Sequence, residues 1–385
     1  MNGAEGFKDR EKVKSPKEIR TGNFAGRRAV LVTFKGKTES ETEETVKELE
    51  SLSLTLRLKV IKEFIYRPDT IHPATYIGKG RLEEIKIYTD REKTDFLIFG
   101  CELTPVQQRN IEDYLKIRVI DRTELILHIF GEHAKSKEGK IQVELAQLSY
   151  ILPRLTGYGV SLSRIGGGLG IKGPGEMKLE VYRRRIKERM HRLKKEIEEI
   201  EKHREIIRMS RKRKNFPVVA VIGYTNVGKT CLINKMSSSN LYVANKLFST
   251  LDPATRGVYL GESRICLITD TVGLLYNIPH DMIEAFKSTL EEVGFADLIL
   301  CVYDSSSPNM DRQYETVIDV LKLLSCEDRK KIDVYNKIDL LNPEDLNILK
   351  NSYPDAVFVS AHSGEGIDIL KERIKEALYG NPVRI

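Results

Sequence analysis

The stretch VVAVIGYTNVGKT at residues 218–230 decides how the second half of the chain folds. It opens on an apolar run typical of a buried strand, and CLINKM at 231–236 follows it with a helical pattern. Its last eight residues fit G-x-x-x-x-G-K-[ST] in the strand–loop–helix context that this phosphate-binding pattern requires. In such a loop backbone N–H groups wrap phosphates at a helix N-terminus, while the lysine neutralises their charge and the hydroxyl binds Mg²⁺. The predicted phosphate-binding residues are Gly223, Tyr224, Thr225, Asn226, Val227, Gly228, Lys229 and Thr230, with Thr230 as the Mg²⁺ ligand.

Three later motifs, each at the end of an apolar strand, indicate which nucleotide is bound. Asp270-Thr271-Val272-Gly273 follows CLIT, and we expect its aspartate to hold the metal through water and its glycine N–H to contact the γ-phosphate. Asn336-Lys337-Ile338-Asp339 fits N-K-x-D, in which the Asp339 carboxylate accepts from guanine N1–H and the exocyclic amine. Adenine offers no such pair of donors. Ser360-Ala361-His362 closes the strand AVFV, where a backbone contact to guanine O6 is expected. The four motifs together predict a guanine nucleotide.

Strands alternate with helices in both halves of the chain, so we predict an α/β fold with parallel sheets. Residues 28–122 are expected to form a small N-terminal α/β domain with the strands RAVLVTF, KVIKEFIY, DFLIF and IRVID. Residues 215–380 are expected to form a doubly wound P-loop GTPase domain, built on VVAVIG, RICLITD, LILCVYD, KIDVYNK and AVFVSA. Its ligand belongs at the carboxyl edge of the sheet. Residues 1–27 read as a solvated tail.

The segment between these domains, residues 123–214, reads as a long antiparallel helical hairpin. Residues 123–155 have a helical pattern interrupted only by Gly131 and Gly139, and 176–212 form a second helix rich in Lys, Arg and Glu. Residues 166–175 hold six glycines and one proline, which predicts a tip that is neither helix nor buried strand.

The tip also contains GLGIKGPG at 168–175, where three glycines fit G-x-G-x-x-G. That pattern marks a dinucleotide site only after a strand and before a helix. The preceding YGVSLSRI is short, polar and interrupted by a glycine, so it makes a poor buried strand. We therefore predict that this loop does not hold the nucleotide.

Charge is concentrated in the same region. The chain carries a net charge of +7, yet residues 164–214 alone hold 18 Lys/Arg and 8 Asp/Glu, so this segment carries the whole basic surplus. A glycine-rich tip flanked by such charge can approach and neutralise RNA phosphates. The candidate RNA-contacting residues are Gly166, Gly167, Gly168, Gly170, Gly173, Gly175, Lys178, Arg183, Arg184 and Arg185. The alternative is a solvated charged helix with a flexible turn.

The composition of the chain indicates in which cellular compartment it works. No apolar run approaches the roughly 18 residues of a membrane span. The first residues lack the apolar core of a signal peptide, and five scattered cysteines without a C-x-x-C pair fit a reducing cytoplasm. We therefore expect a cytoplasmic chain, active as a monomer.

The amino-acid sequences of several motifs resemble those of one family of ribosome-associated GTPases, HflX. The shared segments are YIGKGRLEEI, GCELTPVQQRNIEDYL, VIDRTELILHIF, QVELAQLSYILPRLTG, GPGEMKLE, GYTNVGKT, LFSTLDPATR and DTVG. The resemblance spans residues 28–378, and most of these segments are not shared by GTPases generally. It implies GTP hydrolysis with Mg²⁺ and a hairpin that enters the large ribosomal subunit near its peptidyl-transferase centre.

The resemblance also implies roles for single residues. It places a first switch at Phe248, Ser249, Thr250, Leu251 and Asp252, with Thr250 as the second Mg²⁺ ligand. The residues alone leave Thr255 as a competing candidate for that ligand. Leu274 stands where many GTPases hold a glutamine that orients the attacking water, so slow intrinsic hydrolysis and partner stimulation are implied. Asn226 occupies the position at which similar GTPases bind K⁺, and a purely structural role in the loop is the alternative.

These observations predict a GTP-switched hydrolase that binds the large ribosomal subunit and dissociates or rescues stalled ribosomes. The competing hypotheses are a ribosome-assembly GTPase, a signalling GTPase whose hairpin binds a protein, and an RNA-binding module with incidental nucleotide affinity.

Overall fold

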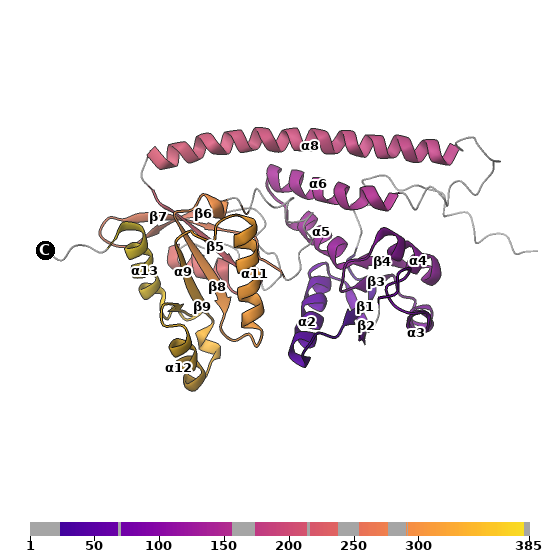
Figure 1. The fold of residues 1–385 in the computed structure, drawn as a ribbon, viewed down its shortest axis with the longest axis horizontal. Helices are drawn as coiled ribbons and strands as arrows, with labels where there is room; N and C mark the ends of the chain where they lie inside the picture. Colours follow the sequence, from indigo (N-terminus) through magenta and orange to yellow (C-terminus); the bar gives the residue numbers. More distant parts are fainter. Residues whose placement is uncertain are drawn as a thin grey trace, which may run out of the picture.

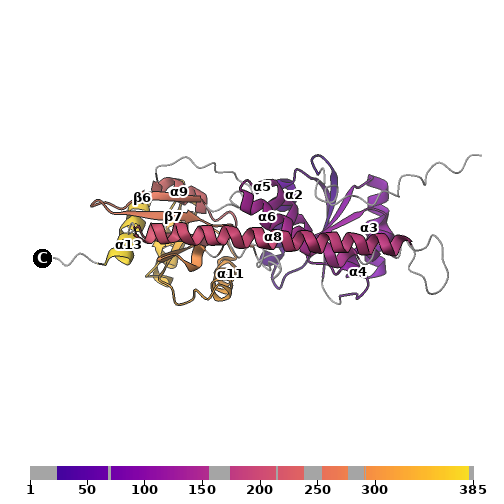
Figure 2. The same cartoon turned by 90° about the horizontal axis from the view of Figure 1, so that it is seen from above.

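The structure is a computed structural model that describes residues 24–67, 71–155, 174–213, 216–237, 254–275, 290 and 292–380. Two α/β units lie side by side, and one long helix runs along both of them (Figures 1 and 2). The predicted α/β class is therefore confirmed, while the limits of the predicted domains stay a prediction.

The N-terminal unit is a parallel sheet of four strands in the order β2-β1-β3-β4. Its elements are β1 (Arg28–Phe34), α2 (Glu39–Thr55), β2 (Lys59–Tyr66), α3 (Lys79–Glu92), β3 (Phe96–Phe99), α4 (Pro105–Leu115) and β4 (Arg118–Asp121). Successive side chains of β1 point to opposite faces of the sheet, and helices cover both faces. Val30 and Val32 pack with α3 and α4, whereas Leu31 packs with α2. Helix α4 begins after Thr104, which caps it in a capping box with Gln107.

The region predicted as one helix over 123–155 is two helices, α5 (Arg122–His133) and α6 (Lys137–Arg154). Ser136 separates them because its side chain accepts a hydrogen bond from Gly139 N at 2.9 Å and so starts a new helix. Buried Leu125 and Ile129 of α5 belong to the same core cluster as Leu31 of β1. Helix α5 therefore covers the N-terminal sheet and is not an arm of the hairpin.

The long helix is α8 (Pro174–Arg213). It runs antiparallel to α6, since Glu144 pairs with Arg189 and the earlier Glu138 pairs with the later Arg204. The expectation that all of residues 166–175 are irregular is wrong for the last two of them, because α8 includes Pro174 and Gly175. Proline fits a first helical turn, where its missing N–H is not needed.

The C-terminal unit has a sheet of six strands in the order β10-β9-β8-β5-β7-β6. Its strands are β5 (Val218–Gly223), β6 (Ala254–Tyr259), β7 (Ile265–Asp270), β8 (Leu298–Asp304), β9 (Lys331–Asn336) and β10 (Val357–Phe358). The helices include α9 (Lys229–Ser237), α11 (Met310–Leu323), α12 (Pro343–Ser352) and α13 (Ile367–Tyr379). All pairings are parallel except that of β6 with β7, and β6 was not predicted. Within the described parts of the chain, no helix is long and apolar enough to cross a membrane.

Candidate nucleotide site

The predicted phosphate loop turns between β5 and α9 at the carboxyl edge of the sheet. The buried Lys229 ammonium lies back across this loop and donates to the carbonyls of Gly223 at 2.9 Å and Tyr224 at 2.8 Å. The predicted second switch, Asp270-Thr271-Val272-Gly273, is held beside it by the next residue, since Leu274 N donates to Gly223 O and Thr225 N donates to Leu274 O. The loop is thus fixed by its own lysine on one side and by the chain after Gly273 on the other.

Three glycines of the site are required by close approach. A Cβ on Gly223 would lie 2.3 Å from Val302 O, and one on Gly228 would lie 2.4 Å from Asn336 Nδ2. Gly228 also has a φ of +92°, which L side chains rarely adopt. A Cβ on Gly273 would lie 2.7 Å from Thr225 Cγ2. Any larger residue at these positions would push the loop out of shape.

The site offers oxygen ligands of the kind Mg²⁺ prefers. Thr230 Oγ1 donates to Asp270 Oδ2 at 2.7 Å, and Asp270 is fully buried at the end of β7. A hydroxyl and a carboxylate this close together fit Mg²⁺, which binds through one or two protein oxygens plus phosphates and water. Thr271 secures the strand end, because its hydroxyl donates to Val221 O at 2.7 Å.

Asn336 joins the three parts of the site that lie far apart in the sequence. Its Nδ2 donates to Val227 O in the phosphate loop at 2.7 Å, and its Oδ1 accepts from Ala361 N at 2.9 Å. Ser360 and Ala361 are buried, whereas Asp339 and His362 are exposed. The Asp339 carboxylate is therefore accessible at the rim of the site.

The sequence reasoning missed Asp304. Its Oδ2 accepts from Lys337 Nζ at 2.6 Å, which holds the lysine of the N-K-x-D motif across the site. Lys337 has a φ of +68°, so its backbone also turns sharply there. The sequence did contain a signal for it, because Asp304 ends an apolar strand, as Asp270 does, and both lie at the same edge of the sheet.

Two residues assigned to the hydrolysis step have defined surroundings. Asn226 is exposed with a φ of +63°, a conformation that asparagine tolerates better than most residues, so the backbone gives a structural reason for it. Leu274 is 1% exposed and packs into the core, so it cannot orient water. The structural role of Asn226 and the K⁺ role are compatible with each other.

Several predicted residues lie outside the described part of the chain. They are Phe248, Ser249, Thr250, Leu251 and Asp252 of the first switch, and Gly166, Gly167, Gly168, Gly170 and Gly173 of the hairpin tip. Thr255, the competitor of Thr250, lies in β6 with its hydroxyl 3.2 Å from that of Thr269. This contact gives Thr255 a role in the sheet.

The remaining hairpin residues lie on α8. Gly175 is in its first turn, and Lys178 is on the same helix, although its side chain is outside the described part. Arg183 is half-buried, whereas Arg184 and Arg185 are exposed, and Arg184 pairs with Glu188 at 2.9 Å. These three arginines therefore belong to the hairpin and not to the C-terminal unit that carries the nucleotide site.

Lys229 makes the site sensitive to pH. Burial lowers the pKa of its ammonium to about 8, although nearby Asp270 opposes the shift. Bound phosphates favour the charged lysine, so above pH 8 binding must take up a proton and the affinity falls as pH rises. We expect the dissociation constant for fluorescent GDP to rise about tenfold between pH 7 and pH 9. An affinity that stays constant over this range would show that Lys229 remains charged throughout.

A glycine loop between a parallel strand and a helix, a hydrogen-bonded Thr–Asp pair beside it and an Asn-Lys-x-Asp motif at the same edge define the class: this is a P-loop GTPase. Family models match most of the chain. They are described as GTP-binding GTPase N-terminal over residues 43–131, GTP-binding GTPase Middle Region over 133–211 and 50S ribosome-binding GTPase over 218–337.

Relatives narrow the class to one family. GTPase HflX of Caldanaerobacter subterraneus subsp. tengcongensis is 47% identical over 352 residues, which cover 91% of this chain and 81% of the relative. GTPase HflX of Escherichia coli is 36% identical over 358 residues, covering 92% of this chain and 84% of the relative. The solved SsGBP–GDP complex is 27% identical, with a TM-score of 0.52 over 91% of this chain and 98% of that chain. The chain belongs to the GTPase HflX family and hydrolyses GTP.

Proposed function

We propose that this GTPase binds the large ribosomal subunit, that GTP switches this binding, and that the protein dissociates or rescues stalled ribosomes in the cytoplasm as a monomer. The observation that carries the proposal is the basic helix α8. Its apolar face, including Ile186 and Leu193, is buried against α6, while Arg184 and Arg185 on the same helix are exposed. Exposed arginines on a helix that is anchored by its apolar face suit the phosphate backbone of RNA. The family model over the C-terminal unit, described as a 50S ribosome-binding GTPase, supports the same partner.

The nucleotide part of the proposal assigns a task to each motif. Residues 223–230 wrap the phosphates, with Lys229 on the β- and γ-phosphates. Thr230 and Thr250 hold Mg²⁺, which when bound neutralises phosphate charge, and Asp270 assists through water. Asp339 reads the guanine N1–H and amine, and a backbone N–H of the Ser360-Ala361-His362 segment contacts its O6. The contacts that support this assignment are those by which Asn336 joins Val227 to Ala361.

Slow intrinsic hydrolysis is part of the proposal. Buried Leu274 has no polar group with which to orient water, so the residue that completes the site must come from a partner or from the first switch. This makes stimulation by the ribosome the expected mode of action.

The cation at Asn226 can be tested directly. If Asn226 binds K⁺ beside the phosphates, GTP turnover will be faster in KCl than in NaCl at equal ionic strength, because Na⁺ is too small to span the same ligands. Turnover should lose this preference in Asn226→Ala, which removes the side-chain oxygen. Equal rates in the two salts would leave Asn226 with its structural role alone.

Binding to particles distinguishes the proposed role from assembly. We expect the GTP-bound protein to co-sediment with mature large subunits at least as well as with immature ones, and far better than with free ribosomal RNA. Preferential binding to immature particles would favour an assembly factor, and no binding to either would favour a partner outside the ribosome.

A further inference from the structure

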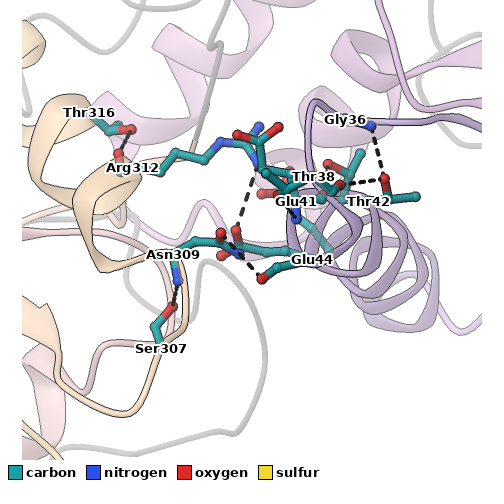
Figure 3. Close-up of polar contacts among 12 residues, drawn as sticks. Gly36, Thr38, Glu41, Thr42, Glu44, Ser307, Asn309, Arg312 and Thr316 are labelled. Carbon is teal, nitrogen blue, oxygen red and sulfur yellow. Dashed lines mark hydrogen bonds and ion pairs between the residues drawn. The ribbon is translucent and has the colours of Figure 1, made fainter.

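One face of α2 contacts the GTPase unit. Ser40, Glu44 and Glu48 are spaced by four residues and therefore lie on one side of the helix. Ser40 Oγ donates to Asn309 Oδ1 at 3.4 Å. Glu44 lies 3.7 Å from the guanidinium of Arg312, which is in the first turn of α11 (Figure 3). Glu48, one turn further along, reaches the phosphate loop itself. The N-terminal unit thus touches the nucleotide site through this helix face, which we call the α2 docking face.

The contact on the phosphate loop is made by Tyr224. Its hydroxyl donates to Glu48 Oε2 at 2.5 Å, while its carbonyl accepts from Lys229 Nζ at 2.8 Å. One residue therefore connects the N-terminal unit with the lysine predicted to hold the phosphates. Moving the Tyr224 side chain would move the peptide that orients this ammonium.

Glu48 is itself held in place. Arg122, the first residue of α5, donates to Glu48 Oε1 from Nη2 at 2.6 Å and from Nε at 3.2 Å. The Glu48 and Arg122 side chains are only 14% and 13% exposed, so solvent does not screen this pair as it does an ordinary surface ion pair. The carboxylate presented to Tyr224 consequently has a fixed position, set by α2 and α5 of the N-terminal unit.

We propose that Glu48 is a positioning residue for the phosphate loop: the Arg122–Glu48–Tyr224 chain holds Tyr224 so that Lys229 meets the phosphates. The N-terminal unit thereby contributes to nucleotide affinity without touching the nucleotide. The inference rests on GTP binding at residues 223–230 and not on the ribosome, so it is tested with the full chain and no ribosomes present.

The test is a double-mutant cycle on the dissociation constant of fluorescent GDP. Tyr224→Phe removes only the hydroxyl and keeps the carbonyl contact with Lys229. Glu48→Gln keeps the side-chain shape and removes the charge that Arg122 holds. We expect each variant to weaken GDP binding by about five- to tenfold, which is the net effect of one ordinary hydrogen bond. The double variant should bind no more weakly than either single variant, because both changes break the same chain.

The matched control is Glu44→Gln, on the same face but in contact with Arg312 instead of the loop. It should keep the affinity of the parent within about twofold. The proposal is overturned if Tyr224→Phe binds GDP like the parent, or if the two losses multiply in the double variant. Equal weakening by Glu44→Gln would also overturn it, since any disturbance of the docking face would then suffice. Tyr224→Phe decides the question alone if Glu48→Gln fails to fold.

Discussion

Asp339→Asn is expected to weaken GTP binding by about 100-fold or more, because the carboxylate loses two hydrogen bonds from the guanine base. The replacement amide offers one acceptor and presents an NH₂ group to a base edge that itself donates. Xanthine carries a carbonyl in place of the amine, so the same variant should bind XTP better than the parent does. Asp339 is exposed at the rim of the site, so its loss should leave the fold intact.

Competition of GTP and XTP against a fluorescent nucleotide measures both effects. Glu344→Gln, at an exposed acidic position in the first turn of α12, is the matched control and should bind GTP like the parent. Undiminished GTP binding by Asp339→Asn would show that the base is read elsewhere.

Replacing residues 166–173 by a short Gly-Ser turn is expected to abolish ribosome-stimulated turnover while leaving GTP affinity nearly unchanged. Pro174 is kept because α8 begins there. The reason is that the described nucleotide-site residues all lie on the C-terminal unit, whereas residues 166–173 lie between α6 and α8 in the sequence. Large-subunit binding by sedimentation and GTP affinity by fluorescence give the two results independently.

The same RNA contact can be tested through the salt dependence of large-subunit binding, by changing the arginines near the tip. Neutralising Arg183, Arg184 and Arg185 to glutamine should lower the slope of log affinity against log salt, by up to about one unit for each phosphate that is no longer neutralised. Glutamine is chosen because glutamate at 184 would face Glu188 one turn away. Lys350→Gln, an exposed charge on α12, is the control and should keep the slope. A loop variant that no longer bound GTP but still bound the subunit would instead make G-x-G-x-x-G the nucleotide site.

Much of the fold could be predicted because its central strands are continuous apolar runs. The limits of β1, β2, β5 and β8 agree with the predicted segments to the residue. Strand β6 was missed because ATRGVY is short and half polar, and only its antiparallel pairing with β7 makes it a strand. The break between α5 and α6 was missed because no glycine or proline marks it, and the capping hydroxyl of Ser136 decides it.

The individual motifs of the site could be predicted from sequence, but the hydrogen bonds that join them could not. Each motif is recognisable by residue types at fixed spacing, so Lys229, Asp270 and Asn336 could be found from sequence. The bridge from Asn336 to Val227 and Ala361, and the contact of Glu48 with Tyr224, join residues more than 20 positions apart. Glu48 lies on a polar helix face that reads like any solvated one, because a long-range contact leaves no local periodicity.

The central claim is that the large ribosomal subunit is the partner that activates GTP hydrolysis. GTP turnover with and without purified large subunits tests it most directly, using the parent and the variant with the replaced 166–173 tip. We expect slow turnover by the protein alone and at least about tenfold faster turnover with subunits, in the parent and not in the tip variant. The same slow rate in the parent with and without subunits, at concentrations where both components are saturating, would contradict it.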